Sequence, residues 1–435
     1  LAGVATVGDL ARAARLAIGS DVGGPPARGL LARFGAELPQ LLRRVDAQRG
    51  RQLLIEGRWV TDLASVNYLG LDLEPEVLRS VGPMVEQWGA HPSWTRIVAS
   101  PAPYHDLEEA LARLTGAAET LVFPTITLTH LGLLPLLASR ADTLVVDRSA
   151  HHSVQEAAEL AAARGATLRR FEHRDPASLA RALDGARGRP VVALNGVYSM
   201  TGTVPDLAAI TEQASAAGGL VYVDDAHGIG ILGRVPDLDT PYGRGGGGVV
   251  AHLGLGYDNI VYVAGLSKAF SSMAAFVTCR DPDERARFEQ ASTAVFSGPV
   301  PVASLATALA GLAVNAERGD DLRRHLHRLT SRAIDGARER GWPVDNPLAF
   351  PVVNLVTGGV ERTVAASRVM WEHGILFTPS VFPAAPLDRG GFRISFTAAN
   401  TDDDVVRLLA GLDAVTAALG PPPAVAAAWS SMPDA

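Results

Sequence analysis

The sequence predicts an α/β fold, with a mostly parallel central sheet and a smaller C-terminal α+β domain. Short apolar runs rich in β-branched residues recur through the middle of the chain, and stretches with helical spacing separate several of them. Continuous apolar strands that alternate with helices are typical of a parallel sheet covered on both faces. The predicted strands are Thr143–Val146, Thr167–Phe171, Pro190–Leu194, Leu220–Val223, Asn259–Val263 and Ala275–Thr278, and the helices between them are Val154–Arg164, Pro176–Ala186 and Leu207–Ala216.

The composition is that of a globular protein: of 435 residues, 47% are hydrophobic and 20% are charged, and the formal net charge is −7. This balance excludes a disordered chain and provides ample material for a core. Because there is no basic block, nucleic acid is a poor candidate partner. The single cysteine, Cys279, excludes an internal disulfide, so we expect a cytoplasmic location. No signal peptide is expected, because Asp9 and Arg12 precede any long apolar region.

Two stretches, Thr120–Ser139 and Ala291–Ala316, contain no charged residue and could be mistaken for membrane spans. Prolines and many small or hydroxylated residues interrupt both of them. We therefore expect buried core segments and no membrane span.

Further elements are expected on both sides of the central alternation. Residues 52–63 predict a hairpin around Glu56-Gly57, and the mixture of strands and helices from Trp342 to Leu419 predicts the smaller domain. The expected organisation is an N-terminal helical arm and hairpin (1–64), a large domain (65–303), a small domain (304–420) and a tail (421–435). The additional predicted helices are Leu10–Ile18, Leu30–Ala47, Pro75–Trp88, Asp106–Thr115 and Val302–Gly341.

A glycine-rich insertion, Gly243-Arg-Gly-Gly-Gly-Gly248, interrupts the alternation. It lacks the GxxxxGK[ST] pattern of a phosphate-binding loop, and no strand leads directly into it. We therefore expect a flexible surface loop.

The strongest chemical signal comes from two strand ends. One apolar strand ends in Asp224-Asp-Ala-His227, and another leads into Ser267-Lys268. A lysine that forms a Schiff base, and a carboxylate that keeps the pyridine nitrogen protonated, are the two groups that a pyridoxal phosphate enzyme needs. Taken alone, the same residues also fit a solvated lysine and an aspartate that caps the next helix.

Further motifs in the same order extend this signal over about residues 52–418, and with them the chain resembles the α-oxoamine synthase family of fold type I pyridoxal phosphate enzymes. The resemblance implies the fold type I architecture and pyridoxal 5'-phosphate as cofactor. The gap between Asp224 and Lys268 is longer than in the family, because it contains the glycine-rich insertion. The motifs are Ser65-Val-Asn-Tyr-Leu-Gly-Leu71, Leu107-Glu108, Asp147-Arg-Ser-Ala-His151-His-Ser153, Gly196-Val-Tyr-Ser199-Met-Thr-Gly202, Asp224-Asp-Ala-His227-Gly228, Ser267-Lys268-Ala-Phe270 and Phe392-Arg393-Ile-Ser-Phe-Thr397.

The resemblance also implies a role for individual residues. Lys268 would be the Schiff-base lysine and the base that removes the Cα proton, Asp224 would pair with the pyridine nitrogen, and His151 would stack on the ring. His227 and Ser199 would bind the ring hydroxyl side. Further expected contacts are Arg393 and Asn67 with the substrate, Thr125, Ile126, Thr127 and Ser267 with the cofactor, and Ser297 and Gly298 with the cofactor of a partner subunit. The neighbouring His151 and His152 have no second ligand cluster, so no metal is expected.

The chain departs from the family pattern at several of these positions. Thr125-Ile126-Thr127 replaces the usual Ser-Gly-Phe/Tyr of the phosphate cup, and Gly265 replaces a threonine. Asn195 replaces a glutamate and Tyr104 a histidine. Backbone N–H groups at a helix N-terminus and the threonine hydroxyls can still bind phosphate. These changes suggest a specialised member of the family.

The expected reaction is the condensation of an amino acid with an acyl thioester, with loss of carbon dioxide, to give an α-amino ketone. The sequence leaves the amino acid, the acyl chain and the carrier open, and acyl-CoA and acyl carrier protein both remain candidates. Another fold type I reaction, transamination or amino-acid C–C cleavage, is an alternative because it would share the fold and the lysine. A binding protein with degenerate chemistry is a second alternative. A homodimer is expected.

Overall fold

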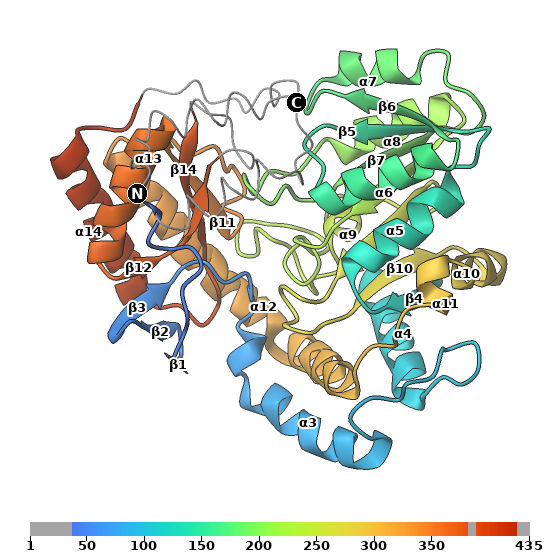
Figure 1. Cartoon of the computed structure of the whole chain (residues 1–435), viewed down its shortest axis with the longest axis horizontal. Helices are drawn as coiled ribbons and strands as arrows, with labels where there is room; N and C mark the ends of the chain where they lie inside the picture. Colours follow the sequence, from blue (N-terminus) through green and yellow to red (C-terminus); the bar gives the residue numbers. More distant parts are fainter. Residues whose placement is uncertain (1–36, 382–388, 424–435) are drawn as a thin grey trace, which may run out of the picture. The chain divides into compact units, whose positions relative to one another are not determined.

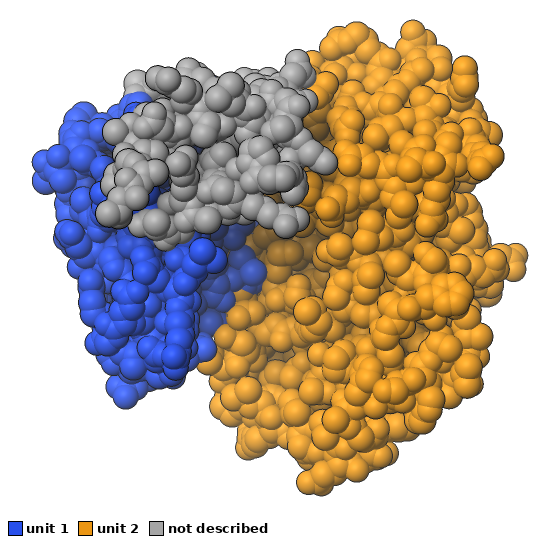
Figure 2. Space-filling model, viewed as in Figure 1, with its two compact units in different colours: residues 1–66, 200–203, 326–435 blue, residues 67–199, 204–325 orange. Residues whose placement is uncertain are grey.

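The computed structural model describes residues 37–381 and 389–423 (Figure 1). The chain divides into two compact units, which Figure 2 colours separately. Unit 1 comprises residues 1–66, 200–203 and 326–435, and unit 2 comprises residues 67–199 and 204–325. The domain boundaries expected from the sequence stay a prediction.

Unit 2 is built on a seven-stranded sheet with the order β4-β10-β9-β8-β7-β5-β6. Neighbouring strands from β9 to β6 are parallel, whereas β10 is antiparallel to both β4 and β9. The prediction of a mostly parallel sheet is thus confirmed. The strands are β4 (Glu119–Phe123), β5 (Thr143–Asp147), β6 (Thr167–Phe171), β7 (Val191–Asn195), β8 (Leu220–Asp224), β9 (Ile260–Gly265) and β10 (Ala275–Cys279).

Helices of unit 2 follow the strands as the sequence pattern requires, and Figure 1 shows them around the sheet. The helix expected at Asp106–Thr115 begins earlier, at Ala102, directly after Pro101. The helices are α3 (Pro75–Trp88), α4 (Ala102–Thr115), α5 (Ile126–Leu137), α6 (His152–Ala163), α7 (Pro176–Leu183), α8 (Leu207–Ala216), α9 (Val249–His252), α10 (Pro282–Glu289), α11 (Ser292–Val295) and the first part of α12 (Val302–Glu339), with a 3₁₀ turn at Leu71–Leu73.

The two charge-free stretches predicted to be core are buried to different extents. Thr120–Ser139 contains most of β4 and the whole of α5, and its leucines pack with α6 and the sheet in one hydrophobic cluster. Ala291–Ala316 contains α11 and the start of α12, and half of its apolar residues are buried, whereas Phe296 is exposed. Among the described residues, no helix is both long and apolar enough to cross a membrane.

The glycine-rich insertion is not the flexible surface loop that we expected. Gly246 and Gly248 are buried, and their backbones exchange hydrogen bonds with Gly230 and Leu232 at 2.8 and 2.7 Å. A Cβ atom on Gly248 would lie 2.0 Å from the Tyr262 hydroxyl. The glycines therefore serve close backbone packing with positive φ angles, and composition alone could not separate this from flexibility.

Unit 1 contains two small sheets, of order β1-β2-β3-β12 and β11-β14-β13. The predicted hairpin is present: Glu56 and Gly57, both with positive φ, join its two antiparallel strands. The strands are β1 (Ala47–Arg49), β2 (Gln52–Ile55), β3 (Arg58–Asp62), β11 (Val352–Gly358), β12 (Ile375–Leu376), β13 (Thr378–Ser380) and β14 (Gly390–Ser395), and the helices are α13 (Val360–Glu372), α14 (Asp402–Leu419) and the end of α12.

Neither of the two helices predicted for the N-terminal arm is confirmed. Leu10–Ile18 lies outside the described residues. The helix expected over Leu30–Ala47 is wrong for its described part, since residues 38–46 form turns and irregular chain and Ala47 begins β1. Pro39, which lacks an N–H group, accounts for the break.

Candidate active site

The site is assembled at the carboxyl ends of three neighbouring parallel strands of unit 2. Asn195 ends β7 and lies opposite Asp224, which ends β8, and Asp224 in turn lies opposite Val263 of β9. Lys268 follows three residues after the last residue of β9, Gly265. Ligands of such sheets bind beyond this edge, which is where the two strand-end motifs were expected to meet.

Asp224 is a buried carboxylate that accepts hydrogen bonds from neighbouring residues. Its Oδ2 accepts a hydrogen bond from the Asn195 amide at 2.9 Å, and its Oδ1 accepts one from the backbone N–H of Ala226 at 3.1 Å. The Nε2 atom of His130 lies 3.3 Å from Oδ2. Burial by itself would raise the pKa of Asp224, but the His130 imidazole and the charge of Lys268 hold it well below its usual range. The site therefore contains an anion.

Lys268 is half-buried in the turn that connects β9 to β10. Its charge acts on both Asp224 and His151, since it lowers the pKa of each. It is also the only lysine in the sequence. Any Schiff base on a side chain of this protein must therefore form at Lys268. Ser267, beside it, is exposed.

His151 is the N-cap residue of α6. Its Nδ1 atom lies 2.7 Å from the hydroxyl of Ser153 and accepts a hydrogen bond from the Ser153 N–H at 3.3 Å. Its backbone N–H donates to the Asn195 side chain at 2.7 Å. Restricted hydration lowers the pKa of His151, while the charge of Asp224 acts in the opposite direction. Asn195 thus connects the predicted stacking residue to the predicted ring partner.

His227 is buried, and its Nδ1 atom lies 2.7 Å from the Tyr68 hydroxyl. Tyr68 directly follows Asn67, the predicted substrate-binding residue, so this contact brings two distant sequence motifs together. Ser199 lies half-buried on the chain after β7. Its predicted contact with the ring hydroxyl stays a prediction.

The predicted phosphate cup forms the start of α5. Thr125 is the N-cap residue, and its side chain accepts a hydrogen bond from the Leu128 N–H at 3.2 Å. Ile126 and Thr127 open the helix, where free N–H groups favour anions. A Cβ atom on Gly265 would lie 3.3 Å from the Ile126 Cβ, so the two departures from the family pattern contact each other.

Two further predicted groups belong to other elements. Ser297 and Gly298 follow α11 and line a separate cavity of about 380 Å³ with Trp94 and Ile97. This matches their expected role only if a partner subunit contributes them, which stays a prediction. Arg393 belongs to unit 1, on β14, where its Nη2 donates to the Thr378 hydroxyl at 3.3 Å. Its expected binding of a substrate carboxylate also stays a prediction.

Sequence reasoning missed His130 and Tyr68 as neighbours of the site. The one available signal for His130 was that it is the only titratable residue of the charge-free stretch Thr120–Ser139. Tyr68 lay within a quoted motif, but nothing in its spacing indicated a contact with His227. In both residues the partner is more than 90 positions away in the sequence.

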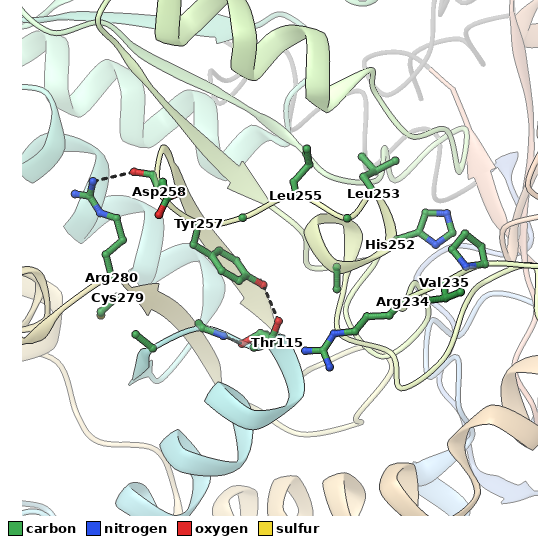
Figure 3. A pocket seen from close by; sticks show the side chains of 17 residues that line it. Thr115, Arg234, Val235, His252, Leu253, Leu255, Tyr257, Asp258, Cys279 and Arg280 are labelled. Carbon is green, nitrogen blue, oxygen red and sulfur yellow. Dashed lines mark hydrogen bonds between the residues drawn. The ribbon is translucent and has the colours of Figure 1, made fainter.

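A cavity of about 760 Å³ in unit 2 is lined by none of the predicted site residues (Figure 3). Arg234, His252 and Tyr257 contribute to its wall, and the Tyr257 hydroxyl donates to the Thr115 carbonyl at 3.2 Å. It is therefore distinct from the strand-end site. Among the described residues, no group of histidine, cysteine and carboxylate side chains could hold a metal ion.

The family Aminotransferase class I and II matches residues 59–412 of the chain. The chain belongs to this family. It is 33% identical to an 8-amino-7-oxononanoate synthase of Pseudomonas putida over 386 residues, covering 88% of this chain and 95% of the relative. An 8-amino-7-oxononanoate synthase of Stutzerimonas stutzeri is 32% identical over 407 residues, with 93% and 97% covered.

Solved structures share the fold at lower identity. A Sphingomonas wittichii serine palmitoyltransferase superposes with a TM-score of 0.83 at 23% identity, covering 93% of this chain and 99% of that one. The 8-amino-7-oxononanoate synthase of Francisella tularensis gives a TM-score of 0.67 at 17% identity, covering 83% and 98%. The chain is accordingly an enzyme of the α-oxoamine synthase group, which confirms the resemblance and the fold type I architecture.

The residues present fit the pyridoxal phosphate of this family. Asp224 supplies a buried anion for a protonated ring nitrogen, and Lys268 supplies the amine. The N-terminus of α5 offers Thr125, Thr127 and backbone N–H groups for phosphate. Because Gly265 has no side chain, Ile126 has room in the cup. The donor set therefore matches each polar end of the cofactor.

Proposed function

We propose that this protein condenses an amino acid with an acyl thioester, with loss of carbon dioxide, to form an α-amino ketone. The observation that carries the proposal is the meeting of an ionised, buried Asp224 with the only lysine of the chain at one sheet edge. The 8-amino-7-oxononanoate synthase relatives support the same reaction class.

When bound, pyridoxal phosphate supplies an electron sink that stabilises negative charge at the substrate Cα atom. Asp224 keeps the ring nitrogen protonated, because its depressed pKa makes it a permanent anion at neutral pH. Lys268 takes the proton from Cα and returns it. His151 would lie against the ring, and its lowered pKa favours the neutral imidazole there. His227 and Ser199 bind the ring hydroxyl.

Substrate positioning falls to residues outside this centre. Arg393 presents a planar fork of donors that matches a carboxylate, so it fixes the orientation of the amino acid. Asn67 assists it. Thr125, Ile126, Thr127 and Ser267 hold the phosphate end. Ile126 makes this cup bulkier than in the family, and Gly265 provides the room for it, which supports a specialised substrate. We expect the enzyme in the cytoplasm.

Product analysis tests the reaction class. The purified enzyme is incubated with single amino acids and with acyl-CoA or acyl carrier protein thioesters, and products and free thiol are measured by mass spectrometry and thiol titration. We expect one pair to yield an α-amino ketone with equal amounts of thiol and carbon dioxide. Formation of a keto acid, or of an aldehyde and a smaller amino acid, without thiol release would instead assign transamination or C–C cleavage.

We also propose a homodimer in which Ser297 and Gly298 reach the partner's cofactor. Large apolar side chains surround this segment and remain exposed: Phe296 by 86%, Val98 by 76% and Ile97 by 66%. Thr95 donates a hydrogen bond to the Val295 carbonyl at 2.9 Å, so the two exposed segments lie together. A cluster of this kind favours burial by a second copy.

Light scattering of Phe296→Ser tests the dimer. The variant should dissociate at concentrations at which the wild type remains a dimer, and should lose cofactor affinity as it does so. Leu238→Ser is the matched control, because Leu238 is 98% exposed and lies outside this cluster. A wild type that is monomeric and fully active would contradict the proposal.

A further inference from the structure

His130 contacts two side chains of strand β8, those of Asp224 and Tyr222. It lies on α5 and is fully buried. Its Nε2 atom lies 3.3 Å from Asp224 Oδ2, and its Nδ1 atom lies 2.8 Å from the hydroxyl of Tyr222. Tyr222 and Asp224 are two residues apart on β8, so their side chains lie on the same face of the sheet. One imidazole therefore contacts both.

The helix that carries His130 also forms the predicted phosphate cup. Thr125 caps this helix, and His130 lies four residues after Ile126, one turn further along. Thr129, next to His130, donates its hydroxyl hydrogen bond to the Thr125 carbonyl at 2.9 Å, which holds this first turn. The same rigid element thus links the phosphate cup to the carboxylate of Asp224.

The donors around Asp224 fix its orientation. Oδ2 faces the Asn195 amide and His130, and Oδ1 accepts from the Ala226 N–H. An ionised carboxylate offers about four acceptor positions, so these three contacts leave one, on Oδ1. That position is available to the N–H of a protonated ring.

The chemistry of the two partners determines the hydrogen positions on His130. Asp224 is ionised and can only accept, so the Nε2 atom that faces it must carry a hydrogen. Burial raises the pKa of Tyr222 far above its usual range, so its phenol keeps its proton and can donate it to Nδ1. His130 can therefore accept from Tyr222 at Nδ1 and present its Nε2 hydrogen toward Asp224, 3.3 Å away.

The neighbouring residue Asp225 shows what burial does without such a chain. Asp225 is as deeply buried as Asp224, but its partners are the Tyr262 hydroxyl and the N–H groups of Val249 and Gly228. Burial raises its pKa to about 7. Asp224 differs in facing the imidazole of His130 and the charge of Lys268, and its pKa moves in the opposite direction.

We propose that His130 is a positioning residue that keeps the Asp224 carboxylate ionised and aimed at the ring nitrogen of pyridoxal phosphate. The proposal rests on the role proposed above for Asp224. Loss of His130 should weaken cofactor binding and shift the ring proton, whereas a residue that only fills space would change neither.

The test compares His130→Phe, which keeps the ring volume without a donor, with His130→Gln, whose amide can replace the Nε2 donor. Affinity for pyridoxal phosphate and the ¹⁵N shift of the ring-labelled cofactor are measured. His130→Phe should lose affinity about tenfold or more, as expected for a hydrogen bond to a charged group, and should move the ¹⁵N shift toward neutral pyridine. His130→Gln should remain close to wild type.

His173→Phe is the matched control, because it removes another buried histidine–aspartate contact, with Asp147 at 3.0 Å, outside the site. It should leave both readouts unchanged. A wild-type affinity and ¹⁵N shift in His130→Phe would overturn the proposal. If Asp224→Ala also left the ¹⁵N shift unchanged, the role of Asp224 itself would fail, which separates the two proposals.

A second measurement applies even if His130→Phe does not fold. The ¹⁵N spectrum of the histidines in the cofactor-free wild type should show His130 with its hydrogen on Nε2, and Tyr222→Phe should alter that signal. A hydrogen on Nδ1 alone would overturn the proposal, since Nε2 could not then donate to Asp224.

Discussion

Gly265 and Ile126 lie so close together that a Cβ atom on Gly265 would be 3.3 Å from the Cβ of Ile126 and 3.6 Å from its Cγ2. Each residue departs from the family pattern, and the contact explains why the departures occur together. A branched side chain in the cup is compatible with a glycine at the end of β9, where a threonine would be crowded.

We therefore predict that Gly265→Thr weakens pyridoxal phosphate binding by about tenfold, because the added side chain must displace Ile126 from the cup. The double variant Ile126→Ala/Gly265→Thr should recover most of that loss. Equilibrium binding of the cofactor to the four proteins of this double-mutant cycle checks the coupling. Additive effects of the two changes would show that the residues act independently.

Lys268→Ala should abolish covalent attachment of the cofactor. Lys268 is the only lysine of the chain, so apart from the N-terminal amine no other amine is available. After borohydride reduction, the wild type should gain the mass of the reduced cofactor and become resistant to a lysine-specific protease. The variant should gain no mass. Cofactor found on a peptide that lacks residue 268 would refute this assignment.

Asp225 should make the protein less stable as pH rises from about 4 to 7. Its pKa is raised to about 7 in the folded protein and is near 4 in an unfolded chain, so in this window the folded state binds more protons. The free energy of unfolding then falls with increasing pH and levels off above pH 7. Asp225→Asn should flatten this part of the profile in thermal unfolding experiments. A profile with the same slope in both proteins would assign the pH dependence to other groups.

Arg393→Lys should raise the amino-acid concentration needed for half-saturation by about tenfold, while leaving the cofactor affinity unchanged. A lysine cannot reproduce the two parallel hydrogen bonds of a guanidinium group to a carboxylate. Arg340→Lys is the control, since Arg340 lies in an exposed ion pair with Asp413 at 2.9 Å, which contributes little. Spectral titration with glycine, alanine and serine distinguishes the two, and equal curves for Arg393→Lys and wild type would remove Arg393 from the site.

The meeting of Asp224, Lys268 and His151 could be predicted because all three follow parallel strands, whose carboxyl ends share one edge. Local pattern also located six of the seven strands of the large sheet to within about two residues of their observed ends. It missed β4, most of which lies inside the charge-free stretch that was predicted only as core. The direction of β10 could not be predicted this way, since an apolar run carries no information about whether its neighbours are parallel.

His130 shows where local reasoning ends. Its neighbours in the sequence, Thr129 and Leu131, indicate no site, and within α5 it is one buried residue among several. Its importance arises only from packing against β8, which places it beside two side chains that lie more than 90 positions further along the chain. The prediction of a flexible loop at the glycine-rich insertion was wrong for a related reason. Its glycines allow close packing against residues 230 and 232 and against Tyr262.

His151 caps α6 through the same ring that is expected to lie against the cofactor. The cap depends on the lone pair of Nδ1, which accepts from the Ser153 N–H. A proton on that atom would abolish the acceptor, so acidification would release the first turn of α6 at the moment the ring becomes a cation. The lowered pKa of His151 delays this event to more acidic conditions. Protonation of His151 would therefore loosen the start of α6 as well as change the charge beside the cofactor.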